Sequence, residues 1–126
     1  MRKLISILVA IMFVASFGIA YAANGDIIWS KIYPADNYYS YGVTTDTQNN
    51  VIVTGYSGSN YLIIKYGSNG KLLWPTALIG PPGIPYAVAT DSQNNIIVTG
   101  NNGTVKYSPN GNYIWDEPYP GTAYTV

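Results

Sequence analysis

Apolar and β-branched residues occur along most of this chain in short runs, each ended by a turn rich in Asn, Gly or Pro. Such runs are typical of β-strands, and beyond residue 22 no stretch has the apolar spacing of an amphipathic helix. The predicted strands are residues 42–46, 51–54, 61–66 and 71–74, followed by 87–91, 96–99, 104–107 and 112–115. The pattern therefore predicts an all-β chain of antiparallel strands joined by tight turns.

The same segment occurs twice. Residues 41–74 read YGVTTDTQNNVIVTGYSGSNYLIIKYGSNGKLLW, and residues 86–115 read YAVATDSQNNIIVTGNNGTVKYSPNGNYIW. Residues 24–29 match the end of this segment and residues 122–126 match its start. Four strands in about 40–45 residues is the period of a β-propeller blade. We therefore expect an incomplete β-propeller of about two and a half four-stranded antiparallel blades.

Two features of the repeat predict how its strands are connected. Asn49-Asn50 and Asn69-Gly70 are hairpin signals, because Asn and Gly tolerate a positive φ angle. The Pro-rich residues 80–83 are expected to link one blade to the next, and residues 26–29 are expected to form a lone fourth strand.

The shared pattern V-x-T-D-x-x-x-N-[VI]-I-V-T-G, then K-Y, then N-G-x-x-x-W, resembles the bacterial and archaeal β-propeller repeat often called the seven-bladed propeller repeat. It is also similar to the NHL repeat. The resemblance covers residues 25–126 and implies a propeller of many copies. Since only two copies are whole here, we expect a fragment of a longer propeller, completed by missing blades or by self-association.

The first residues have the order of a secretory signal peptide. Arg2 and Lys3 precede an apolar run over residues 4–19, and residues 20–22 read Ala-Tyr-Ala. An uncleaved anchor is the alternative, but the run is shorter than the roughly 20 residues that span a bilayer. We expect residues 1–22 to be a signal peptide and residues 23–126 to be the partial propeller, with no membrane span after cleavage. The protein is then secreted, periplasmic or held at the cell surface.

The amino-acid composition limits the classes of function that we expect. The chain has no histidine and no cysteine, so the usual general base and the thiolate metal ligands are missing. We predict no catalytic residue, no metal site and no cofactor, and hence no enzyme. After residue 22 there are four lysines and six acidic residues, which leaves no basic patch for nucleic acid. The main hypothesis is a non-enzymatic binding or scaffold module.

Asp46 and Asp91 stand at the same place in the two copies, each followed by a polar turn. Calcium binding is one interpretation, but the spacing differs from that of the calcium loop D-x-[DN]-x-[DN]-G. We expect each carboxylate to accept hydrogen bonds from its own turn. Lys65 and Lys106 also recur, and we expect both to be solvated or at an edge.

A tryptophan ends each copy of the motif N-G-x-x-x-W, at Trp29, Trp74 and Trp115. The three rings could form a ladder on which a ligand stacks. We favour a packing role instead, with each ring buried between neighbouring blades, because packing requires one Trp per blade.

Thirteen tyrosines are many for this length. Several stand near the links between blades, where exposed rings could bind a protein or a glycan or could cover blade edges. The candidate ligand-binding residues are Tyr38, Tyr39, Tyr86 and Tyr119. Asn102 begins the sequon Asn-Gly-Thr and is a candidate glycosylation site.

Two alternative functions remain. The first is a carbohydrate-binding, lectin-like propeller assembled from short chains. The second is a fragment of a propeller enzyme whose active site lies in the missing blades.

Overall fold

A computed structural model describes residues 27–33, 38–74, 78–119 and 126. The chain divides into two compact units, Met1–Pro34 and Ala35–Val126. The strands are β1 (Tyr38–Thr45), β2 (Val51–Ser57), β3 (Asn60–Tyr66), β4 (Leu78–Pro82), β5 (Pro85–Thr90), β6 (Ile96–Gly100), β7 (Gly103–Tyr107) and β8 (Tyr113–Glu117). The predicted signal peptide, residues 1–22, lies outside the described residues, as does most of the partial repeat 122–126.

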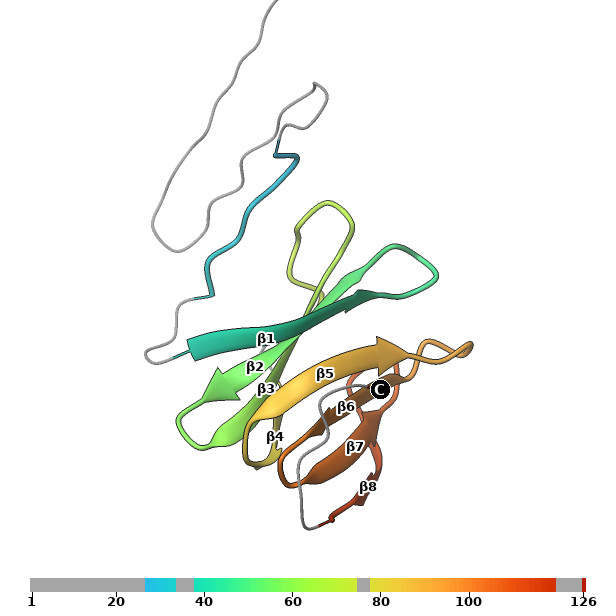
Figure 1. The fold of residues 1–126 in the computed structure, drawn as a ribbon. Helices are drawn as coiled ribbons and strands as arrows, with labels where there is room; N and C mark the ends of the chain where they lie inside the picture. The colour runs from blue at the N-terminus through green and yellow to red at the C-terminus, as the bar shows by residue number, and fades with distance from the viewer. Residues whose placement is uncertain (1–26, 34–37, 75–77, 120–125) are drawn as a thin grey trace, which may run out of the picture. The chain divides into compact units, whose positions relative to one another are not determined.

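The eight strands form two four-stranded sheets, one from each whole copy of the repeat. The strand orders are β1-β2-β3-β4 and β5-β6-β7-β8, and every neighbouring pair is antiparallel (Figure 1). Each sheet is thus a meander that follows the chain order. The prediction of an all-β chain with four-stranded antiparallel units is confirmed.

The turns after β1 and after β3 share one geometry. After β1, the Asn49 amide donates to the Asp46 carbonyl at 3.0 Å and Asn49 has a φ of 63°. After β3, the Gly70 amide donates to the Gly67 carbonyl at 2.8 Å and Gly70 has a φ of 82°. Both are three-residue loops whose last residue is left-handed, the conformation that Asn and Gly adopt most easily. The predicted turns are present, although Asn69-Gly70 is not the two-residue turn typical of an Asn-Gly pair.

The fourth strand of the first sheet is not where the sequence placed it. Residues 71–74 contribute only one bridge, between Tyr66 and Leu72, and pairing with β3 resumes at Leu78. Trp74, at the end of this segment, is buried in the core cluster. β4 therefore includes Pro81 and Pro82, which were predicted to belong to a link. An edge strand accommodates proline because its outer N–H groups have no strand partner.

The second copy keeps the strand where the sequence predicted it. In β8, Trp115 pairs with Lys106 and the strand continues past the tryptophan to Glu117. The predicted lone strand at residues 26–29 is wrong for residues 27–29, which are not in a strand, and residue 26 is outside the described residues. None of the described residues belong to a helix long and apolar enough to span a membrane.

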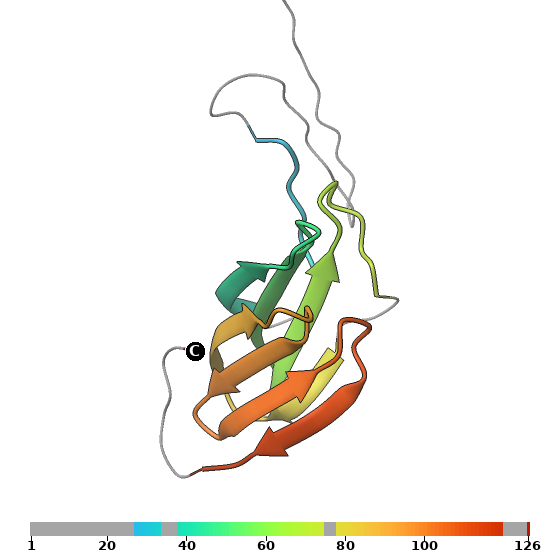
Figure 2. The ribbon, with the colours of Figure 1, turned by 90° about the vertical axis from the view of Figure 1, so that its right-hand side faces the viewer.

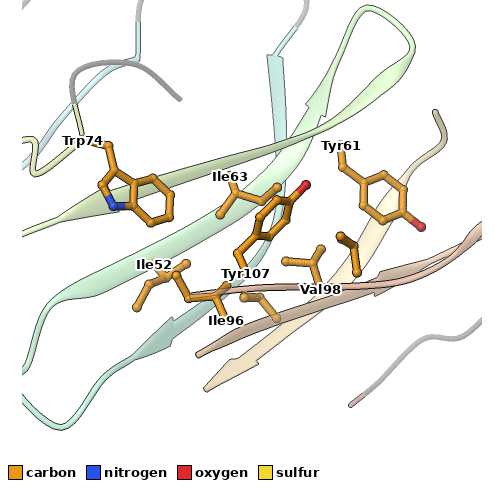
Figure 3. Close-up of a cluster of buried hydrophobic side chains, with 9 residues drawn as sticks. Ile52, Tyr61, Ile63, Trp74, Ile96, Val98 and Tyr107 are labelled. Atoms are coloured by element: carbon orange, nitrogen blue, oxygen red, sulfur yellow. The ribbon is translucent and has the colours of Figure 1, made fainter. Parts of the chain in front are cut away.

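The core lies between the two sheets. β5 contacts both β1 and β2, and Figures 1 and 2 show the second sheet beside the first. The cluster contains Ile52, Tyr61, Ile63 and Trp74 from the first copy and Val88, Ile96, Val98, Val105 and Tyr107 from the second. Figure 3 shows Trp74 and Tyr61 at opposite ends of this cluster. One copy alone could not bury these residues, so the two sheets stabilise each other.

Candidate functional site

A buried ion pair within the first copy also contacts the second copy. The Lys65 Nζ lies 3.0 Å from Asp46 Oδ2, and the two side chains are only 6% and 1% exposed. The same ammonium group donates to the Pro109 carbonyl of the second copy at 3.1 Å. The prediction that Lys65 is solvated is therefore wrong. A charged side chain can be buried here because it finds a carboxylate and a carbonyl as partners.

The carboxylate of Asp46 also organises its own turn. Asp46 Oδ1 accepts from the Gln48 and Asn50 amides, both at 2.9 Å, and Oδ2 accepts from Asn50 Nδ2 at 2.9 Å. These bonds confirm the predicted structural role. Burial by itself raises the pKa of Asp46, but the hydrogen bonds from Asn50, Lys65 and Gln48 outweigh it and hold that pKa below the ordinary 3.8.

We expect the protein to lose stability in acid because of this carboxylate. A depressed pKa in the folded state stabilises the protein above the pKa of the unfolded state, about 3.9, and the effect is lost as the pH falls towards the folded value. The midpoint of urea unfolding should therefore fall as the pH drops below about 4. Asp46→Asn is the control, since it should show a flatter pH dependence. A midpoint that rises in acid would contradict the assignment.

The second copy repeats the pair in a more open setting. Lys106 Nζ lies 2.8 Å from Asp91 Oδ2, and the side chains are partly exposed. The Lys106 ammonium, followed by the Asn95 side chain, holds the pKa of Asp91 well below its usual range. Lys106 is thus partly solvated, as predicted, but it does not lie at an edge, because β7 pairs with β6 and with β8.

The tryptophans also differ between the copies. Trp74 is 7% exposed, and a Cβ at Gly111 of the second copy would lie 3.4 Å from its Cε2 atom. Trp115, its counterpart, is 41% exposed. The predicted packing between sheets is confirmed for Trp74. Trp29 belongs to the other compact unit and is half-buried.

Two of the candidate ligand-binding tyrosines, Tyr39 and Tyr86, each form a ring pair near the starts of β1 and β5. We call the two pairs together the tyrosine surface: Tyr39 with Tyr56 and Tyr41 with Tyr86. The Tyr41 and Tyr86 rings are in edge-to-face contact across the two sheets, with centroids 5.8 Å apart at 77°. The Tyr39 and Tyr56 rings, on paired residues of β1 and β2, have centroids 6.4 Å apart. Tyr39 and Tyr41 are both exposed. The surface therefore offers aromatic faces at the start of β1.

Irregularities of the strands create this surface. The register shifts between Ser40 and Gly42 in β1 and between Pro85 and Ala87 in β5, so Tyr41 and Tyr86 are the extra residues of two equivalent bulges. A bulge re-aims the side chain of its extra residue. Sequence analysis missed Tyr41, although its equivalence to Tyr86 in the repeat was a usable signal. Tyr38, a further candidate, is half-buried.

The remaining candidates meet in an open pocket of about 510 Å³, lined by Pro81, Pro82, Asn102, Asp116, Pro118 and Tyr119. We call it the proline pocket. The Tyr119 hydroxyl is held by Thr99 and Thr104, and Asn102 Nδ2 donates to the Pro82 carbonyl at 3.0 Å. Asn102 is exposed, and its glycosylation stays a prediction.

Asp116 supplies the charge of the proline pocket, and sequence analysis did not single it out. Its Oδ1 atom accepts a short hydrogen bond from the Tyr113 hydroxyl. This bond, more than burial, raises the pKa of Tyr113. Hydroxyl groups of a ligand could bind Asp116 and Asn102 while an apolar face rests on Tyr119 or the prolines.

No protein-family model matches the chain, and no curated protein matches it. A solved structure of a protein of unknown function from Bacteroides caccae is similar at 14% sequence identity and a TM-score of 0.56. The similarity covers 88% of this chain and 44% of that chain, so this chain spans less than half the length of its structural relative. The similarity concerns the fold alone, and the resemblance to a propeller repeat family stays a prediction.

Proposed function

We propose that this chain is an exported, non-enzymatic binding module built of propeller-type blades. Its two sheets pack through opposite faces, as consecutive blades do. The first sheet uses the face that carries Ile52, Ile63 and Lys65, which we call the forward face. The second sheet uses the face that carries Ile96 and Val98, which we call the rear face.

The repeat alignment supports this packing. Ile52 corresponds to Ile97 in the second copy, and Ile97 lies on the opposite side of β6 from Ile96 and Val98. The two copies therefore do not face each other symmetrically. Each copy has one face for the copy before it and another for the copy after it, which is the arrangement of a blade in a propeller.

The observation that carries the binding role is the tyrosine surface. Tyr39 and Tyr41 are exposed, yet ring contacts with Tyr56 and Tyr86 restrict their motion. Rigid exposed tyrosines offer a large amphipathic contact area at low entropic cost. A protein or glycan partner could stack on these rings.

A carbohydrate-binding, lectin-like role is the second candidate. The proline pocket favours it, because it places Asn102 and Asp116 beside the Tyr119 ring. Amide and carboxylate groups bind sugar hydroxyls, while a ring covers the apolar face of a sugar.

A glycan array and a panel of extracellular proteins, probed with the exported chain, test the proposal. We expect Tyr39→Ala or Tyr86→Ala to weaken binding roughly fivefold, since one aromatic contact contributes about 1 kcal/mol. Leu73→Ala is the control, since it truncates a 44% exposed apolar side chain that belongs to neither the tyrosine surface nor the proline pocket, and it should bind as the unmodified chain does.

The kind of ligand decides between the two candidates. Binding to sugars favours the lectin-like role, and binding to proteins alone favours the scaffold role. Binding that survives both Tyr39→Ala and Tyr86→Ala contradicts a role for the tyrosine surface.

A further inference from the structure

The surfaces that join the two copies inside the chain recur on its outer faces. Trp74 on the forward face of the first sheet is 7% exposed, whereas its counterpart Trp115 on the second sheet is 41% exposed. Val88 on the rear face of the second sheet is 9% exposed, whereas its counterpart Val43 on the first sheet is 66% exposed. Each half of the internal interface thus has an exposed duplicate.

The polar groups of the internal interface are duplicated as well. The Thr90 hydroxyl donates to the Thr45 carbonyl at 3.0 Å, and Asn94 Nδ2 donates to the Thr47 hydroxyl at 2.8 Å. In the alignment of the copies, the donors Thr90 and Asn94 correspond to Thr45 and Asn49, and both of these are exposed. Asn49 and Asn94 also share a backbone φ of 63°, so both are left-handed at the same place in their turns.

The acceptor side is retained in the second copy. The carbonyl of Thr45 corresponds to that of Thr90, and the hydroxyl of Thr47 corresponds to that of Ser92, which is exposed. The duplicate of Lys65 is Lys106, which already pairs with Asp91. The second copy therefore presents the same acceptors and the same tryptophan that the first copy uses internally.

We infer that two molecules of this chain dock head to tail. The rear face of the first sheet of one molecule packs on the forward face of the second sheet of the other molecule. The inference rests on the blade packing of the proposed function. In this contact Trp115 of one molecule and Val43 of the other become buried. Asn49 of the molecule that contributes Val43 donates to Ser92 of the molecule that contributes Trp115. Because the two surfaces differ, the contact is heterologous and forms a ring when the rotation closes.

Sedimentation velocity of the exported chain at micromolar concentration tests the inference. We expect oligomers for the unmodified chain. Trp115→Lys and Val43→Lys should each weaken association roughly 30-fold or more, as expected when a charge replaces a central apolar contact. Both side chains are exposed in the single chain, so its fold should tolerate the changes. Unchanged circular dichroism and an unchanged urea midpoint under dilute conditions would verify this.

Ile114→Lys is the matched control. Ile114 adjoins Trp115 in β8 and is 43% exposed, while its counterpart Leu73 is 44% exposed although the internal interface is formed. The contact therefore does not include this position, and Ile114→Lys should associate as the unmodified chain does.

Mixing the two variants distinguishes a head-to-tail contact from a symmetric one. Trp115→Lys keeps the rear face of its first sheet intact, and Val43→Lys keeps the forward face of its second sheet intact. The mixture should therefore form heterodimers of one molecule of each variant and nothing larger. A monomeric unmodified chain overturns the inference. An association that Val43→Lys or Trp115→Lys leaves intact also overturns it, and so does a mixture of the two variants that stays monomeric. A monomer that still binds its ligand through the tyrosine surface overturns this inference alone and leaves the proposed function standing.

Discussion

Replacing Trp74 by alanine is expected to lower the free energy of unfolding by about 3–5 kcal/mol, the usual loss for a buried large aromatic residue. The ring is 7% exposed and belongs to the cluster that joins the two sheets. It packs close to Gly111 of the second copy, so its removal leaves a cavity between the copies rather than within one of them. Because small domains are stable by only about 5–15 kcal/mol, this loss is a large fraction of the total stability.

Trp115→Ala is the matched comparison, since it changes the same residue of the same motif. Its ring is 41% exposed, so the loss should be below about 1 kcal/mol. Urea unfolding followed by far-ultraviolet circular dichroism would measure both losses, in solutions dilute enough to exclude association. Equal losses for the two variants would show that Trp74 does not hold the sheets together.

Replacing Lys65 by methionine is expected to cost about 3–5 kcal/mol, because one partner of a buried ion pair is removed. Asp46 would keep its bonds from Gln48 and Asn50 but would lose the ammonium group 3.0 Å away. A carboxylate with a 1% exposed side chain would then carry a charge that no cation balances. The contact with the Pro109 carbonyl across the interface would be lost as well.

Two comparisons separate the charge effect from lost packing. Lys106→Met removes the equivalent lysine from a partly exposed pair and should have a clearly smaller effect, since solvent screens that pair. Adding Asp46→Asn to Lys65→Met removes the unbalanced charge and should recover part of the stability. A double variant less stable than Lys65→Met would refute an electrostatic cause. The unfolding free energies come from the same urea experiment.

Local features of the fold could be predicted because they depend on neighbours in sequence. β2, β3, β6 and β7 begin within one residue of the predicted starts. The left-handed Asn49 and Asn94 follow from the tolerance of Asn for a positive φ, and the Asp46 carboxylate bonds to amides two and four residues away. The candidate site was anticipated in part, since Tyr39 and Tyr86 lie on the tyrosine surface and Tyr119 and Asn102 line the proline pocket.

The amino-acid sequence by itself determined that this protein is made of two similar antiparallel units with fixed turns, because short-range backbone preferences and turn hydrogen bonds act within each copy. Only the tertiary structure decided how equivalent residues differ. Trp74 meets the second copy and leaves its strand, while Trp115 stays in β8 and remains exposed. Lys65 is buried and donates to the Pro109 carbonyl, and the Tyr41 ring contacts the Tyr86 ring. These outcomes depend on which surface packs against which. The repeated motif cannot predict them, because it is nearly the same in both copies.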